Sequence, residues 1–261
     1  MTTKTKIHFA PTYFQNPSHN LSVTLIGCGG TGSQVLTSLA RMNATLVALG
    51  HPGLHVYVYD SDVVTESNIG RQLFSPSDLN RFKSDVLVER INRYFNLNWQ
   101  SCPHNIDKTY DIQSNIIISC VDNIKTRKLI DLSFKDVIQR DHTDYKKAYY
   151  WLDFGNTNDA GQVILASRKI VLKSKFEKYQ HVSQLPTIFK LFPEFEKIKE
   201  KNTGPSCSVA EAIKKQDLFV NSILAQLGCN LLWKLIKEGS LEYQGLFMNL
   251  KTMNVKPIKI K

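Results

Sequence analysis

A glycine-rich turn between an apolar strand and a helix constrains the fold of this chain more than any other feature. The turn reads Gly27-Cys28-Gly29-Gly30-Thr31-Gly32, follows the apolar run Val23–Ile26 and precedes a helix predicted over residues 31–49. Glycines let the backbone turn tightly and approach a polyphosphate, and the free N–H groups at a helix N-terminus attract anions. The turn therefore predicts a nucleotide site, although dehydrogenases carry the same pattern.

Strands and helices alternate after this turn. The apolar runs 55–60 and 116–121 are predicted strands, and helices are predicted over 82–95 and 123–140. This alternation predicts an α/β fold with a doubly wound, Rossmann-like and mostly parallel sheet. Further predicted elements are the strands Tyr149–Phe154 and Gln162–Ala166, a helix from about Val209 to Glu238, and a C-terminal extension of the sheet at Leu246–Leu250.

Residues 1–261 are expected to form one domain, because an apolar content of 42% supports a buried core. The stretch 167–206 is rich in lysine, glutamate and proline, yet it keeps several phenylalanines. We interpret it as an inserted, crossover-like and partly mobile segment.

Composition argues against several classes of protein. No apolar run approaches the ~20 residues that span a bilayer, and no signal sequence is recognisable, so a cytoplasmic protein without membrane contact is expected. Five cysteines without C-x-x-C spacing indicate neither a disulfide framework nor structural zinc. The excess of 33 basic over 23 acidic residues is compatible with nucleic acid, an acidic protein or a polyphosphate, and does not choose among them.

Polar residues suited to a nucleotide lie just beyond the predicted strands. Asp60 ends the second strand, where an acidic residue commonly binds a ribose hydroxyl. Asn68 and Arg71 offer an amide and a guanidinium fork for phosphate oxygens, and Lys83 adds a movable charge. Asp122 follows a buried strand, and a carboxylate beside a triphosphate normally holds Mg²⁺.

Each of these residues also has a structural alternative. Asp60 could be a solvated cap, Arg71 or Lys83 could form a surface ion pair, and Asp122 could be a helix N-cap.

The order of these motifs resembles the ThiF/MoeB/ubiquitin-activating-enzyme superfamily. The glycine turn is similar to the glycine loop of that superfamily. Its other motifs resemble, in order, Asp60 and Asp62, Asn68 with Arg71 and Gln72, Lys83-Ser84-Asp85-Val86, and Asp122-Asn123 with Arg127. Within the superfamily, His51-Pro52-Gly53-Leu54, Gly70-Arg71-Gln72-Leu73-Phe74 and Ser206-Cys207-Ser208 look like the ThiF proteins of the PRTRC cassette.

The resemblance implies an enzyme that uses ATP and Mg²⁺ to adenylate the C-terminal glycine of a small ubiquitin-like protein. A homodimer and a conjugating-type acceptor protein are also expected by analogy. The resemblance assigns ribose to Asp60, phosphates to Asn68, Arg71 and Lys83, and Mg²⁺ to Asp122. The remaining nucleotide-binding residues that it implies are Gly27, Gly29, Gly30, Gly32 and Asp62.

Two departures from the superfamily pattern concern catalysis. Residues 1–22 lack the arginine with which many relatives reach the neighbouring subunit's ATP. The segment 167–206 contains no cysteine for a thioester, so Cys207 is the nearest candidate nucleophile, with a small packed residue as the alternative. An NAD(P)-dependent oxidoreductase and a non-catalytic scaffold, with DNA as a conceivable partner, remain as alternative functions.

Overall fold

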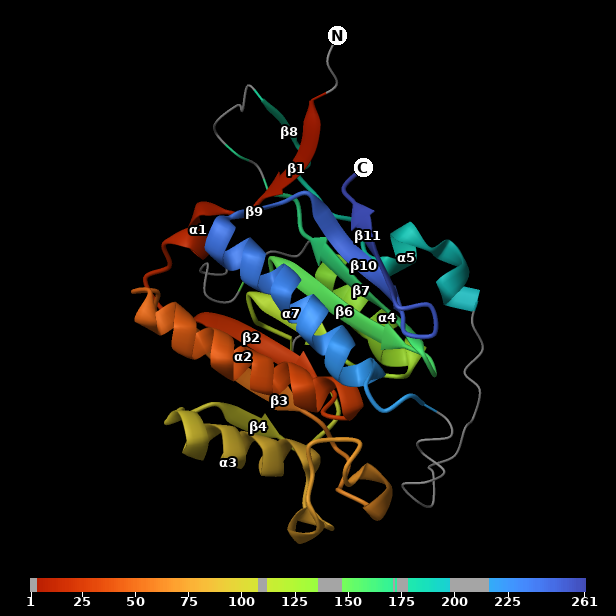
Figure 1. Ribbon diagram of the computed structural model, residues 1–261. Coiled ribbons are helices and arrows are strands. Elements are labelled where there is room, and N and C mark those ends of the chain that lie inside the picture. The colour runs from red at the N-terminus through yellow and green to blue at the C-terminus, as the bar shows by residue number, and fades with distance from the viewer. Residues whose placement is uncertain (1–3, 108–111, 136–146, 171, 173–177, 198–215) are drawn as a thin grey trace.

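The computed structural model describes residues 4–107, 112–135, 147–170, 172, 178–197 and 216–261. An eight-stranded sheet lies at its centre, with strand order β11-β10-β7-β6-β5-β2-β3-β4 (Figure 1). In chain order these strands are β2 Leu21–Ile26, β3 Leu54–Tyr59, β4 Gln100–Cys102, β5 Ile116–Ser119, β6 Tyr150–Asn156, β7 Ala160–Ser167, β10 Tyr243–Asn249 and β11 Asn254–Lys259.

The sheet has a parallel half and an antiparallel half. Strands β6, β5, β2, β3 and β4 run parallel to one another, whereas β7, β10 and β11 add antiparallel pairs beyond β6. Every residue of β2 and β5 is buried, as expected for parallel strands covered on both faces. The predicted α/β, mostly parallel fold and its C-terminal extension are therefore confirmed.

Helices cover both faces of this sheet. Two long helices, α2 Gly30–Ala48 and α7 Val220–Glu238, pack against each other across the front in Figure 1, and α3 Lys83–Phe95 lies beside α2. Helix α4, Ile124–Lys135, lies behind the sheet and belongs to a second apolar cluster. The crossovers β2-α2-β3 and β5-α4-β6 move along the sheet in opposite directions, so right-handed connections place α2 and α4 on opposite faces.

The antiparallel half extends further than the sequence indicates. The expected end at Leu246–Leu250 is a hairpin of β10 and β11. Strand β11 was missed because its Asn-Val-Lys-Pro-Ile-Lys sequence is polar and contains Pro257. Lysine and proline are frequent on edge strands, where they discourage pairing with other chains.

A second, three-stranded sheet has the order β8-β1-β9 and was not predicted. It joins β1 Thr5–Phe9 to β8 Tyr179–His181 and β9 Ser240–Leu241, with the short helix α1 Thr12–Gln15 following β1. Strands of two to five residues carry too little periodicity to be recognised in sequence.

One predicted helix differs from the structure in part. The continuous helix from Val209 is wrong, because residues 216–219 are not helical and α7 begins at Val220. The described part of segment 167–206 contains ordered elements, β8, α5 Ile188–Leu191 and the 3-10 turn η5 Pro193–Lys197. Residues 198–206, like 136–140 of the expected fourth helix, lie outside the described residues. Two other 3-10 turns are η1 Glu66–Asn68 and η2 Pro76–Asp78.

No helix within the described ranges combines the length and the apolar character that crossing a membrane requires.

The two sheets meet around a fully buried histidine. His8 Nδ1 donates to the Val182 carbonyl at 2.7 Å, and His8 Nε2 accepts from the Tyr150 hydroxyl at 3.0 Å. His8 also stacks on His181, at 5.9 Å between ring centroids. Burial lowers the pKa of His8 from 6.5 to about 4, so the neutral ring is the form that belongs to the folded chain.

We expect the free energy of unfolding to fall as the pH is lowered from about 6.5 towards 4, because the unfolded chain then binds a proton that folded His8 excludes. The loss attributable to His8 is roughly 3 kcal/mol across that window. Urea unfolding of wild type and His8→Gln at pH 7 and pH 4 measures it. Equal pH dependence in both proteins would contradict this assignment.

Candidate functional site

A cavity of about 350 Å³ opens at the carboxyl ends of the parallel strands. Three loops line it, namely the glycine turn after β2, the segment after β3 and the segment after β5, together with residues after β4 and before α7. This is the edge where open α/β sheets bind ligands. Its lining includes Gly27, Gly29, Gly30, Asp60, Asp62, Arg71, Gln72, Lys83 and Asp122. Among the predicted site residues, Gly32 and Asn68 are not part of this lining.

The glycine turn ends in a helix N-terminus that faces the cavity. Helix α2 begins at Gly30, and neither a side-chain cap nor an acidic residue occupies its first turn. Its first N–H groups therefore remain available to an anion, at the positive end of the helix dipole. Gly27 has φ +90°, a conformation that glycine adopts without strain.

Gly32 serves packing rather than the cavity. A Cβ at Gly32 would lie 1.8 Å from the Gly27 carbonyl oxygen, whereas a Cβ at Gly29 would meet nothing within 4 Å. The last glycine of the turn thus allows the helix to pack closely on the preceding strand.

This difference yields a matched pair of variants. We expect Gly32→Ala to lower stability by roughly 1–3 kcal/mol, because a methyl group there overpacks the turn. Gly29→Ala should keep the wild-type melting temperature. Thermal unfolding of both proteins measures the contrast, and equal melting temperatures would show that the close approach at Gly32 does not limit folding.

Asp60 organises the glycine turn. Its Oδ2 accepts from the Cys28 N–H and its Oδ1 accepts from the Asp62 N–H at 2.9 Å. Burial raises the pKa of Asp60, while these two backbone donors oppose the shift. The carboxylate is therefore an internal cap rather than a solvated one, and its edge lines the cavity.

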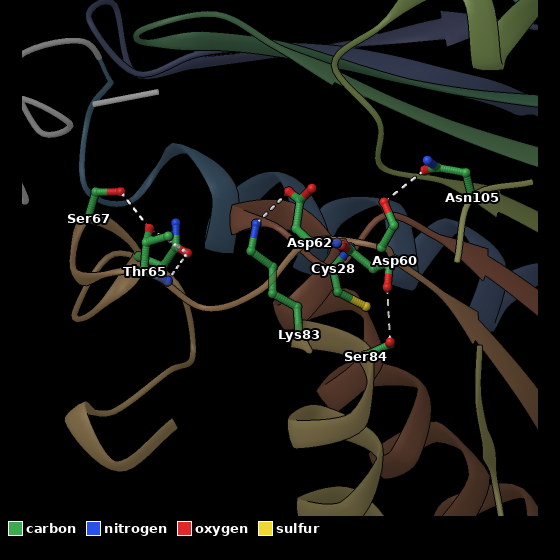
Figure 2. A network of polar contacts seen from close by, with 10 residues as sticks. Cys28, Asp60, Asp62, Thr65, Ser67, Lys83, Ser84 and Asn105 are labelled. Atoms are coloured by element: carbon green, nitrogen blue, oxygen red, sulfur yellow. Dashed lines mark hydrogen bonds and ion pairs between the residues drawn. The ribbon is translucent and has the colours of Figure 1, made fainter. Parts of the chain in front are cut away.

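Lys83 is a buried cation beside the same turn. Its Nζ contacts Asp62 Oδ2 at 2.8 Å, with side-chain exposures of 8% for Lys83 and 67% for Asp62 (Figure 2). The predicted surface ion pair thus exists, but only its acidic partner is at the surface. A lysine held by one exposed carboxylate can exchange that partner for an oxygen of a bound anion.

Asn68 belongs to the loop that carries Arg71. Asn68 Oδ1 accepts from the Thr65 N–H at 2.9 Å and from the Thr65 hydroxyl at 3.1 Å. These bonds form a capping box around η1, and Figure 2 shows Thr65 beside Ser67 in the same turn. The amide therefore shapes the loop just before Arg71.

Arg71 and Gln72 place polar atoms without partners at the cavity. Arg71 Nη1 donates to Gln216 Oε1 at 2.8 Å, but Arg71 Nε is buried and has no hydrogen-bond partner among the described residues. Gln72 Oε1 is likewise buried and has no hydrogen-bond partner among the described residues. Burial also lowers the pKa of Arg71, although it remains a cation at neutral pH. A ligand with phosphate oxygens would satisfy the orphaned guanidinium donor.

Asp122 lies at the cavity without being a helix cap. The cap of α4 is its neighbour Asn123, whose Oδ1 accepts from the Thr126 N–H at 2.8 Å. In the part of the chain that the structure describes, no side chain or N–H group hydrogen-bonds to the Asp122 carboxylate. That part also holds no group of three or more His, Cys, Asp or Glu that could bind a metal. The single carboxylate of Asp122 fits Mg²⁺, because this ion is commonly held by one or two carboxylates together with phosphates and water.

Arg127 of the predicted Asp-Asn-x-x-x-Arg motif points into the core instead. Its Nε lies 2.9 Å from Asp153 Oδ1, and both side chains are at most 5% exposed. Ser119 also donates to Asp153 Oδ1, at 2.5 Å. Burial raises the pKa of Asp153, and Arg127 opposes that shift. This buried ion pair holds β5, α4 and β6 in register behind the site.

The sequence analysis missed a set of amides at the cavity. Gln216 and Asn221, near the start of α7, and Asn156, at the end of β6, all line it. No spacing or periodicity marks these residues. His104, Asn105 and Ile106 were missed too, although they follow β4 and the rule of strand carboxyl ends could have identified them.

Three of the described cysteines have the properties of structural thiols. Cys28 and Cys229 are buried, and burial raises the pKa of each. Cys120 is partly buried and lines the cavity, but burial raises its pKa too. Low thiolate character fits a structural role for all three. Cys207 lies outside the described residues.

Known proteins resemble this chain in sequence. A sequence model described as the ThiF family matches residues 3–261. Ubiquitin-activating enzyme E1 1 of Candida albicans (strain WO-1) is 31% identical over 130 residues, which are 45% of this chain and 12% of that protein. Ubiquitin-like modifier-activating enzyme 6 of Mus musculus is 32% identical over 126 residues, 43% of this chain and 11% of that protein. The matched region is thus only about a tenth of the length of these curated relatives.

Solved structures share the fold. The crystal structure of E. coli MccB with ATP superimposes with a TM-score of 0.58 at 16% identity, covering 95% of this chain and 66% of MccB. The structure of PaaA superimposes with a TM-score of 0.57 at 16% identity, covering 92% of this chain and 64% of PaaA. At this level of identity the similarity establishes the fold.

Proposed function

This chain belongs to the ThiF family, and on that basis we propose that it uses Mg-ATP to adenylate the C-terminal glycine carboxylate of a small ubiquitin-like protein. One observation carries the proposal. A single cavity joins a helix N-terminus without a side-chain cap to a buried guanidinium donor and a carboxylate, neither of which has a hydrogen-bond partner among the residues that the structure describes. Each of these features is suited to a nucleoside triphosphate, and few other ligands would use all of them.

We assign the nucleotide-binding roles from this geometry and from family membership. The N–H groups of the glycine turn and the Arg71 guanidinium would bind phosphate oxygens, and Lys83 would exchange Asp62 for a ligand oxygen. Asp60 would bind the ribose through the edge of its carboxylate that lines the cavity. Asp62 is the ion-pair partner of Lys83. We assign Asn68 a supporting role, because its amide oxygen shapes the loop before Arg71.

Mg²⁺ would be held by Asp122 and by the phosphates of the bound nucleotide. When bound there, the ion would neutralise phosphate charge.

The proposed reaction needs positioned charge and little covalent help from the protein. An oxygen of the glycine carboxylate forms a bond to the α-phosphorus of ATP. The bond from that phosphorus to the bridging β-phosphate oxygen breaks, and pyrophosphate leaves with the electron pair. Arg71 and Lys83 would offset the repulsion between the two anions and hold them in line.

A neighbouring groove supports a protein substrate. It has a volume of about 310 Å³ and begins at Thr157, the residue after cavity-lining Asn156. Its walls include Phe247 of β10, which is 41% exposed, and Lys256 of β11. An extended tail lying in this groove would bring a terminal carboxylate towards the nucleotide cavity, and Lys256 favours an acidic partner.

Several finer expectations remain predictions. They are the homodimer, the conjugating-type acceptor, the relationship to the PRTRC cassette, and a thioester on Cys207 after adenylation. Cytoplasmic location likewise remains a prediction. A thioester and transfer to an acceptor protein would both start from the adenylate formed at this site.

The two alternative functions predict different ligands. An NAD(P)-dependent oxidoreductase would use the glycine turn and Asp60, but it would leave Arg71 and Asp122 without a task. A scaffold that has lost catalysis would bind ATP without turning it over.

ATP–pyrophosphate exchange tests the proposal. Purified protein with Mg²⁺ and labelled pyrophosphate is assayed with and without each small ubiquitin-like protein encoded beside it. Exchange that requires one such protein would support adenylation and identify the substrate. Binding of NADH in preference to ATP would contradict the proposal, and ATP binding without exchange would favour the scaffold.

A further inference from the structure

A network of amide side chains holds the Arg71 guanidinium from one side. Gln216 Oε1 accepts from Arg71 Nη1 at 2.8 Å and from Asn221 Nδ2 at 3.0 Å. Gln216 Nε2 donates to the Thr157 carbonyl at 3.3 Å. Gln216 therefore links Arg71 to the turn between β6 and β7 and to the first turn of α7.

Asn221 fixes this network to the glycine turn. It is 3% exposed, and its Oδ1 accepts from the Thr31 hydroxyl and from Asn156 Nδ2, each at 2.9 Å. A Cβ at Gly30 would lie 2.5 Å from Asn221 Nδ2, so the amide packs directly on the helix that starts at the cavity. A buried amide with three hydrogen bonds has little freedom to move.

The contact to Gln216 leaves most of the guanidinium available. Only Nη1 is engaged, and the buried Nε has no partner among the residues described by the structure. Two donors on Gln216 Oε1 fill both lone pairs of that oxygen. The amide thus anchors one corner of the guanidinium fork without covering its remaining donors.

We infer that Gln216 is a positioning residue for Arg71, and that it sets the orientation in which the guanidinium meets the phosphates. The inference rests on the proposed adenylation. Gln216 is 145 residues away from Arg71 in sequence, so only the folded chain brings the two side chains together. A contact that orients Arg71 should act mainly in the transition state, because the negative phosphate charge that Arg71 offsets has its most defined position there.

The test variant is Gln216→Met, which keeps the length of the side chain but removes both the acceptor for Arg71 and the donor to the Thr157 carbonyl. We expect it to lower kcat for ATP–pyrophosphate exchange roughly 10- to 100-fold, with a smaller change in KM for ATP. The matched control is Gln226→Met in α7. Gln226 donates to Ser38 at 2.9 Å outside the cavity, and its loss should leave kcat unchanged. Melting temperatures of both variants check that folding is intact.

A double-mutant cycle separates positioning from a general structural effect. In an Arg71→Ala background, Gln216→Met should cause no further loss of exchange, since there is no guanidinium left to orient. Independent, additive losses would overturn the inference, and so would an unchanged kcat in the single variant.

A second readout does not depend on activity. In ¹⁵N spectra of arginine side chains, the Arg71 Nη1 protons should exchange with water faster in Gln216→Met than in wild type. Faster exchange with no adenylation by wild type would retain Gln216 as the anchor of Arg71 and contradict only the proposed function. Identical proton exchange in both proteins would overturn the inference whatever the activity.

Discussion

Replacing Arg71 with alanine is expected to lower ATP–pyrophosphate exchange by about 10²–10³-fold. Arg71 combines a half-buried position in the cavity with an Nε donor that lacks a partner among the described residues. An oriented cation in a partly desolvated site stabilises developing phosphate charge far more than one in water. Steady-state exchange over a range of ATP concentrations measures the effect, which should appear in kcat as well as in KM.

Two further variants test whether the effect comes from the guanidinium group of Arg71. Arg71→Lys keeps the charge but loses the planar fork, so it should recover only part of the activity. Arg93→Ala removes a surface arginine that is 81% exposed and paired with Glu89, and it should exchange at the wild-type rate. If Arg71→Ala retained near-normal exchange, Arg71 would have no role in phosphate binding.

Replacing Asp122 with asparagine is expected to have a comparable effect, about 10²–10³-fold, on exchange at low millimolar Mg²⁺. Asp122 lines the cavity, and its neighbour Asn123 already caps α4, so the substitution removes a charge without removing a cap. The loss should diminish as Mg²⁺ is raised, because a weakened ion site can be filled at higher concentration. Titration of exchange activity with Mg²⁺ is the measurement.

The control for this variant is Asp107→Asn. Asp107 is exposed and follows the cavity-lining residues Asn105 and Ile106. It should show the Mg²⁺ dependence of wild type. An Asp122→Asn protein with that same dependence would remove Asp122 from the proposed metal site, while leaving the nucleotide site itself intact.

The inner strands of the central sheet were predictable because they are apolar and buried on both faces. Strands β2 and β5 read as continuous apolar runs since helices cover both of their faces. The small sheet was not predictable. Its pairs Thr5 with Tyr179 and Phe9 with Ser240 join residues far apart along the chain, and each strand is short. Pairing of that kind depends on the packing of the rest of the molecule.

The sequence predicts those parts of the candidate site that depend on the local backbone, namely positions at the ends of strands and the starts of helices. The glycine turn, Asp60, Lys83 and Asp122 all follow strands or begin helices, and parallel strands bring those positions to one edge. Asn68 differs from the expected arrangement, because its short side chain satisfies its own turn before it can reach the cavity.

The amino-acid sequence by itself determined the parallel half of the sheet, the glycine turn and the residues that follow each strand, because these depend on periodicity and on backbone conformation within a few residues. Only the tertiary structure decided that Gln216 and Asn221 meet Arg71 and Thr31, and that Arg127 pairs with Asp153 in the core. Those contacts arise when distant elements pack together and buried polar groups must find partners. No local pattern in the chain encodes which partner they find.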